Sequence, residues 1–146
     1  MNNMKQFTKE MIEIFSAKTR VKILEMLHDG YEHPDELADE LDITRQAVDK
    51  HLKILHDWKL VEKKAIFPSE ERHKIIYEPT SKSDKLISKL NQVAENYRVT
   101  LLDEARQEIE GLDTKLARSE ITEDKYREKL EEIKDSWNYE ELKGQD

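Results

Sequence analysis

One long, regular spacing of apolar residues constrains the fold of this chain more than any other feature. From Asp84 to about residue 118, apolar residues recur every three or four positions, which is typical of one face of an α-helix. These residues are Leu86, Leu90, Val93, Tyr97, Leu101, Ala105, Ile109, Leu112 and Leu116. At 1.5 Å per residue such a helix is about 50 Å long, so it extends beyond a small domain. Its apolar face therefore needs a cover, from the same chain or from a second subunit.

A second, shorter stripe follows and predicts an antiparallel helical hairpin. Ser119 to Thr122 is typical of a turn, Thr122 is a good N-cap, and the next apolar residues are Tyr126, Leu130, Ile133 and Trp137. Homodimerisation is the simplest way to cover what the hairpin leaves exposed, and the alternative is a monomer whose hairpin folds back on its own domain. The residues expected at the dimer interface are Phe7, Met11, Leu86, Leu90, Val93, Tyr97 and Leu101.

Composition limits the class of protein. Charged residues make up 40% of the 146 residues, with only three Gly and three Pro, which favours helix. The absence of Cys excludes disulfides and thiolate metal sites, and apolar runs no longer than three residues exclude a membrane helix. We therefore expect a soluble, cytoplasmic protein. Dense charge of both signs is typical of thermophile proteins, and equally of a long solvated helix.

The first half of the chain predicts four helices and a β-hairpin. The helices cover about 4–15, 16–29, 34–41 and 44–55, with Ser16 and Thr44 as N-caps, Pro34 in a first turn and Gly30 as a C-terminal cap. Strand-like segments at 60–67 and 73–78 flank a tip at 68–72, and Pro79 with Ser81 and Ser83 marks a boundary. This order is that of a winged helix-turn-helix. The predicted fold is mainly α with a small β-hairpin wing: a DNA-binding domain over 1–80, then a helical dimerisation or interaction hairpin over 81–146.

The residues themselves resemble a known family over about 12–80. FSAKTRVKILEMLHDG and PDELADELDITRQAVDKHLKILHDWKLVEKK are similar to the ArsR-type winged-helix transcriptional regulators. The resemblance implies a DNA-binding fold whose recognition helix is 44–55. Two positions depart from the family pattern, since Asp49 stands where Ser is frequent and Lys59 where Gly is frequent. The wing tip also lacks a Gly.

The candidate DNA-binding residues lie on the recognition helix and the wing. Because the net charge is −8, any DNA contact must come from a local patch, and the segment from Ile43 to Lys64 has six Lys and Arg against three Asp and Glu. Arg45 and Gln46 are placed to contact base edges, and Lys50 and Lys53 to contact phosphates. The full set is Thr44, Arg45, Gln46, Asp49, Lys50, Lys53, Lys63, Arg72, His73 and Lys74. His51 and Trp58 are expected to pack in the domain.

Metal, cofactor and enzyme sites are not expected. ArsR-type proteins are often metal sensors, but residues 84–146 contain no His, and His28 and His33 lie in a polar loop region with many structural reasons for polarity. No Gly-rich phosphate loop or nucleophile elbow is present. The segment IEGLDTKLARSEITEDKYREKLEEIKD resembles the short helical SHOCT module, which implies oligomerisation or partner binding.

The sequence therefore predicts a homodimeric, sequence-specific regulator that binds double-stranded DNA, acts as a repressor, and has the wing at 60–78 on the DNA backbone. A protein-interaction module that kept the winged-helix scaffold without specific DNA binding is the alternative. A sensor with a ligand cavity between the dimer helices is a third possibility. A small-molecule or protein effector is left open.

Overall fold

The computed structural model describes residues 2–67 and 74–144. The chain forms two compact units, Met1–Ile87 and Ser88–Asp146. The division falls inside one long helix, α5 (Ser81–Ala117), whose first turns belong to the first unit. Among the described residues, no helix combines the length and the apolar character that a membrane span requires.

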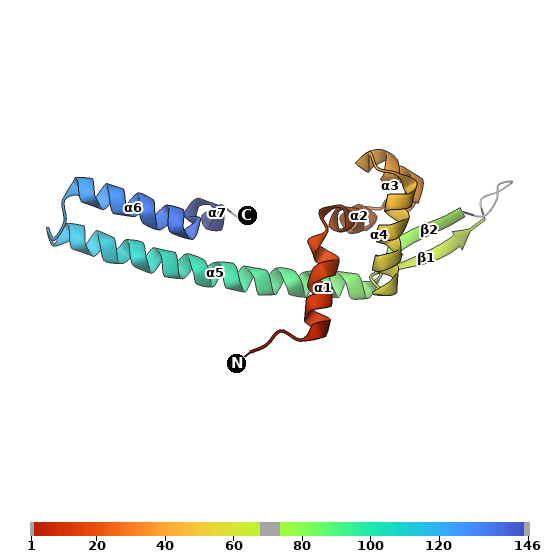
Figure 1. Cartoon of the computed structure of the whole chain (residues 1–146), viewed down its shortest axis with the longest axis horizontal. Helices are drawn as coiled ribbons and strands as arrows, with labels where there is room; N and C mark the ends of the chain where they lie inside the picture. The colour runs from red at the N-terminus through yellow and green to blue at the C-terminus, as the bar shows by residue number, and fades with distance from the viewer. Residues whose placement is uncertain (1, 68–73, 145–146) are drawn as a thin grey trace. The chain divides into compact units, whose positions relative to one another are not determined.

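The first unit contains four helices followed by a two-stranded hairpin (Figure 1). The helices are α1 (Gln6–Ser16), α2 (Lys18–His28), α3 (Pro34–Leu41) and α4 (Arg45–Asp57). The strands β1 (Val61–Ile66) and β2 (Lys74–Pro79) pair antiparallel, from Val61 opposite Pro79 to Ile66 opposite Lys74. The predicted wing tip at 68–72 lies outside the described residues.

Local signals start and end most of these helices as predicted. Pro34 is the first residue of α3, and the Thr44 side chain caps α4 by accepting a hydrogen bond from the Ala47 N–H at 3.1 Å. Gly30 adopts a φ of 110° after α2, a backbone conformation that favours glycine. The prediction that Ser16 caps α2 is wrong: Ser16 ends α1, and its hydroxyl donates back to the Glu13 carbonyl at 2.8 Å.

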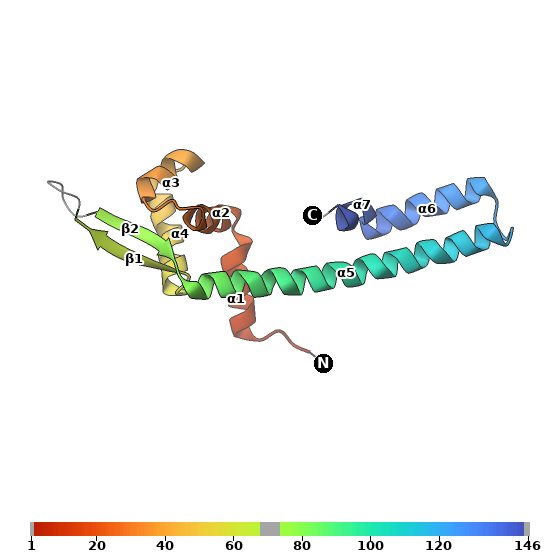
Figure 2. The same ribbon diagram turned by 180° about the vertical axis from the view of Figure 1, so that it is seen from behind.

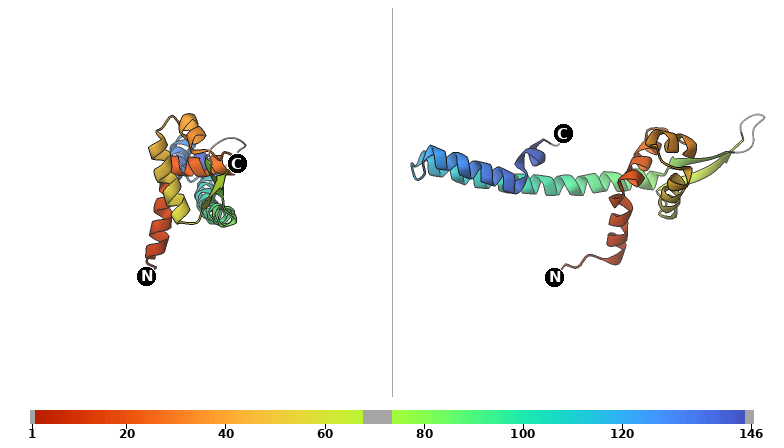
Figure 3. Two further views of the ribbon diagram at one scale, coloured as in Figure 1. Left: turned by 90° about the vertical axis from the view of Figure 1, so that its right-hand side faces the viewer. Right: turned by 45° about the horizontal axis from the view of Figure 1, so that its top comes forward.

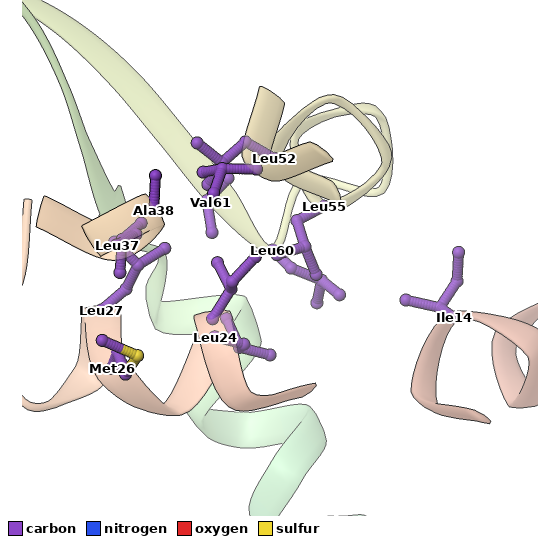
Figure 4. Close-up of a cluster of buried hydrophobic side chains, with 12 residues drawn as sticks. Ile14, Leu24, Met26, Leu27, Leu37, Ala38, Leu52, Leu55, Leu60 and Val61 are labelled. Carbon is purple, nitrogen blue, oxygen red and sulfur yellow. The ribbon is translucent and has the colours of Figure 1, made fainter. Parts of the chain in front are cut away.

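One face of α2, α3 and α4 forms the core of the first unit. Figure 4 shows Leu24 and Leu27 of α2, Leu37 of α3, and Leu52 and Leu55 of α4 pointing toward one another. The predicted inward stripe of α4, which also includes Val48, is fully buried. Because this stripe faces inward, the opposite face of α4 is turned to solvent.

At the junction between α4 and the wing, Lys59 stands where similar proteins frequently have Gly. Lys59 has a φ of 61°, in the left-handed region where glycine is favoured. The Leu60 N–H bonds the Leu55 carbonyl at 2.9 Å and the Lys59 N–H bonds the His56 carbonyl at 3.0 Å, which completes a Schellman cap. Lys59 therefore occupies a glycine-type position.

The second unit is the predicted helical hairpin, with a short helix added. α6 (Glu123–Trp137) runs back along α5 in the views of Figures 2 and 3, and α7 (Tyr139–Lys143) follows it. Thr122 caps α6 by accepting from the Lys125 N–H at 3.2 Å. The Tyr126 hydroxyl bonds Asp113 at 2.5 Å, and the Trp137 indole N–H bonds Glu108 at 2.7 Å. These contacts confirm the hairpin.

The long helix differs from its prediction at its start and in its buried face. It begins at Ser81 rather than Asp84, so Ser83 lies in the first turn, fully buried, instead of marking a boundary. In the second unit the buried residues of α5 are Leu102, Ala105 and Leu112. The predicted stripe included Leu101 and not Leu102. Apolar residues spaced three or four apart define the buried face of a helix only to within about one position.

Candidate nucleic-acid interface

The solvent face of α4 carries the predicted base-reading and phosphate-binding residues. Gln46, Lys50 and Lys53 are exposed, on the side of the helix opposite the buried Val48, Leu52 and Leu55. Thr44 is fixed by its capping hydrogen bond at the same end as Gln46. This face is polar and long enough to lie in a major groove.

Arg45 is held by two carboxylates. Its Nη1 donates to Asp35 at 2.7 Å, which connects α4 to α3, and its Nε donates to Asp49 at 3.0 Å within α4. Burial lowers the pKa of Arg45, but the hydrogen bonds to Asp49 and Asp35 outweigh it and leave the pKa above its ordinary value. The sequence analysis counted Arg45 in the positive patch without a partner outside that segment, and its pairing with Asp35 was missed because the two residues are ten positions apart.

Two more cations of the counted patch are also paired. Lys53 bonds Asp57 at 3.0 Å, and this hydrogen bond lowers the pKa of Asp57. Lys64 bonds Glu78 of the neighbouring strand at 2.7 Å, which raises the pKa of Lys64. The positive charge counted along the sequence therefore exceeds the charge available to DNA. Of the predicted site residues in the described part of the chain, Lys50 and Lys63 form no salt bridge.

The wing brings two of its predicted residues next to α4. Lys63 lines a hollow of about 350 Å³ together with Lys53, His56, Asp57 and Tyr77. Lys74 lines a second hollow, of about 420 Å³, with the side chains His33, Pro34, Asp35, Glu36, Arg45 and Ile75. The solvent face of α4 and the wing therefore form one continuous surface. The predicted Arg72 and His73 lie outside the described residues.

Tyr77 is part of this surface and was not predicted. It is half-buried against the core, and burial together with the negative charge of Asp49 raises the pKa of its hydroxyl. The available signal was its place in β2, opposite Lys63 in the register. Side chains opposite each other in a strand pair share one face of the sheet.

Trp58, His51 and His28 contact other residues of the first unit, as expected for side chains with a structural role. Trp58 packs against the core, with its ring 5.1 Å from that of Phe7. His51 is half-buried, and desolvation, with the nearby charge of Arg20, lowers its pKa. His28 bonds the buried Ser83 at 3.1 Å and pairs with Asp84 at 3.0 Å. Over the described ranges, no cluster of three or more His, Asp or Glu is arranged to hold a metal ion.

The predicted dimerisation residues differ from one another in how exposed they are within one chain. Leu86 packs against the core of the first unit, so its side chain is already used within one chain. Met11, Leu90 and Leu101 are half-buried. The other three predicted dimerisation residues are open to solvent: Phe7 at 68%, Val93 at 68% and Tyr97 at 65%.

Comparison with known proteins supports the interpretation of the first unit as a winged helix-turn-helix. Residues 17–63 match the family described as bacterial regulatory protein, arsR family, which confirms the resemblance over that segment. No curated protein sequence matches the chain. Among solved structures, the reduced form of the transcriptional regulator YodB from B. subtilis is 19% identical, with a TM-score of 0.54 over 63% of this chain and 89% of YodB.

A MarR-family transcriptional regulator from Enterococcus faecalis V583 is 20% identical, with a TM-score of 0.54 over 73% of this chain and 96% of the regulator. At these identities the likeness shows the fold, and it confirms the predicted winged helix-turn-helix.

Proposed function

Because residues 17–63 carry the helix-turn-helix segment of the bacterial arsR-family regulatory proteins, we propose that the chain is a DNA-binding transcriptional regulator. In the finer form of the proposal, it recognises a specific double-stranded sequence as a homodimer and represses transcription by occluding a promoter. The observation that carries it is the solvent face of α4, which lies inside the matched segment and continues onto the wing through Lys53, Lys63 and Tyr77.

In this proposal each recognition helix enters a major groove with its N-terminal end first. Arg45 and Gln46 contact base edges, where Arg pairs with guanine and Gln with adenine. Lys50 and Lys53 of α4, and Lys63 of the wing, contact phosphates and set the register. Arg72, His73 and Lys74 would extend these contacts toward the wing tip.

The distribution of charge supports DNA contact through the first unit. The first unit has 15 Lys and Arg against 17 Asp and Glu, whereas the second has 10 against 16. Since the second unit is the more acidic, it is repelled by the DNA backbone, and DNA affinity must come from the α4 and wing surface.

The exposed face of α5 supports a second copy of this chain as partner. Val93 and Tyr97 lie four residues apart, on one side of the helix, and both are more than half exposed. We expect Tyr97→Glu, alone or with Val93→Glu, to dissociate the dimer in sedimentation, because a charge would be buried at the interface. Asn91→Glu, which places the same acid at an exposed polar position on another side of α5, is the control and should leave the dimer intact.

A second candidate function has one observation in its favour. Arg45, Lys53 and Lys64 are paired with carboxylates, which weakens the positive patch and favours the protein-interaction module. The two candidates differ in salt dependence, since phosphate contacts make affinity fall steeply with salt.

The experiment is selection of duplexes from a random library with the purified full-length protein at physiological salt. Enrichment of an inverted repeat, with half-sites about one helical turn apart, supports the dimeric DNA reader. Lys50→Ala should then reduce the slope of log affinity against log salt by about 0.9, and Lys89→Ala should not change it. No enrichment from a protein that sediments as a dimer would favour the interaction module.

A further inference from the structure

Arg45, Asp35 and Asp49 form a cluster that spans the helix-turn-helix, and we refer to it as the Arg45 clamp. Arg45 is the first residue of α4, Asp35 is the second residue of α3, and Asp49 is one turn along α4. The guanidinium uses two different nitrogens, with Nη1 on Asp35 at 2.7 Å and Nε on Asp49 at 3.0 Å. The arginine is therefore fixed from two sides.

The charge of the clamp differs from that of an ordinary ion pair. One guanidinium and two carboxylates sum to a net negative charge, whereas Lys53 with Asp57 is neutral. A cation at the N-terminal end of a helix is unfavourable by itself, and the two carboxylates offset this. A phosphate that approaches Arg45 would therefore meet a negative cluster.

The Arg45 clamp leaves one guanidinium nitrogen, Nη2, to donate a hydrogen bond to an uncharged acceptor. Within the described residues, no hydrogen bond is formed by Nη2 of Arg45. Asp35 and Asp49 are 80% and 50% exposed, and the hollow lined by Arg45, Asp35 and Lys74 gives space beside the guanidinium. A guanine edge presents uncharged acceptors, N7 and O6, which the carboxylates do not repel as they repel phosphate.

Resting on the proposed function, we propose that Asp35 and Asp49 are specificity-determining residues that make Arg45 read base edges rather than phosphates. An unpaired arginine at this position would bind phosphates of any sequence, and it would add affinity without discrimination. The clamp removes that sequence-independent affinity and orients the guanidinium. Asp49, where the family frequently has Ser, thus positions the residue that reads the base.

The test compares Asp35→Asn and Asp49→Asn with Asp39→Asn. Asp39 is exposed on α3, and its side chain forms no salt bridge in the described part of the chain, so its variant makes the same charge change without releasing Arg45. Affinity for the selected duplex and for a scrambled duplex is measured at several salt concentrations.

We expect the two clamp variants to bind scrambled DNA at least threefold more tightly and to lose specificity by a similar factor. Their salt slope should steepen by up to about 0.9, the contribution of one added phosphate contact. Arg45→Ala should abolish the effect of Asp35→Asn. The inference is refuted if Asp35→Asn and Asp49→Asn change both duplexes by the same factor, as expected for Asp39→Asn.

A measurement without DNA separates failure of this inference from failure of the proposed function. The Arg45 Nε–H signal in an NMR spectrum should be protected from exchange in the wild type and lose protection in Asp49→Asn. A protected signal in a protein that selects no duplex overturns the proposed function, and the inference with it. Specific DNA binding with clamp variants that match Asp39→Asn overturns the inference alone.

Discussion

One buried hydrogen bond helps to attach the first turn of α5 to α2, and it permits a quantitative prediction. Ser83 is fully buried, and its hydroxyl lies 3.1 Å from Nε2 of His28. No other hydrogen bond of that hydroxyl exists among the described residues. His28→Ala removes the partner, so a buried hydroxyl is left unsatisfied at a cost of about 1–3 kcal/mol. The contact of His28 Nδ1 with the exposed Asp84 carboxylate adds little.

The same hydroxyl has opposite effects in the two backgrounds. Ser83→Ala in the wild type should cost about 0.5–1.5 kcal/mol, because His28 remains partly exposed and can bond water instead. In His28→Ala, however, Ser83→Ala deletes an unsatisfied group, so it should be neutral or stabilising. The double mutant should therefore be more stable than the sum of the single costs predicts, by at least about 0.5–1.5 kcal/mol.

The assay is urea unfolding of all four proteins at neutral pH, followed by helical circular dichroism. Equal m-values would show that the variants unfold from comparable native states. A cost of Ser83→Ala that is the same in both backgrounds, within about 0.5 kcal/mol, would refute the reasoning. In that case the hydroxyl finds another partner and the contact does not connect α2 to α5.

Two further predictions concern glycine and histidine. Gly111→Ala should stabilise α5 by about 0.5–1 kcal/mol, because a Cβ at this position meets nothing within 4 Å. Gly30→Ala should destabilise the protein, because residue 30 has a φ of 110°. Thermal unfolding in which both variants shift the melting temperature in the same direction would contradict this prediction. Burial, with the charge of Arg20, lowers the pKa of His51, so the folded state binds a proton less readily than the unfolded state. Stability should therefore fall as the pH drops below about 6.5, and His51→Gln should weaken that dependence in unfolding measured at pH 5 and 7.

Features of the fold that depend on neighbouring residues were predictable from the sequence. The caps at Thr44 and Thr122 and the glycine conformation at Gly30 each involve groups a few positions apart. The inward stripe of α4 follows from helical periodicity alone. The start of α5 was less predictable, because Ser81 and Ser83 are typical of both a loop and a helix N-terminus. The start of α5 is set by Thr80. Its hydroxyl accepts a hydrogen bond from the Ser83 N–H at 3.2 Å and donates one to the Lys59 carbonyl at 2.7 Å.

The electrostatics of the candidate interface were the least predictable part, and the reason is physical. A count of charges from Ile43 to Lys64 includes Arg45 and Lys64 as available cations, but their closest partners are Asp35 and Glu78, which lie outside that segment. Only the packing of α3 on α4 and the pairing of β1 with β2 bring them together.

The pairing of these cations with carboxylates, in a chain that is acidic overall, limits non-specific affinity for DNA. Non-specific affinity rises with the number of phosphates that a protein neutralises, and here pairing holds that number low. In the proposed function, Lys50 and Lys63 are the predicted DNA-binding cations that form no salt bridge within the described residues, so more of the affinity would come from base edges and from the second copy in a dimer. The exposed Val93 and Tyr97 and the Arg45 clamp are thus two parts of one proposal: weak binding by each half, and discrimination when both halves bind.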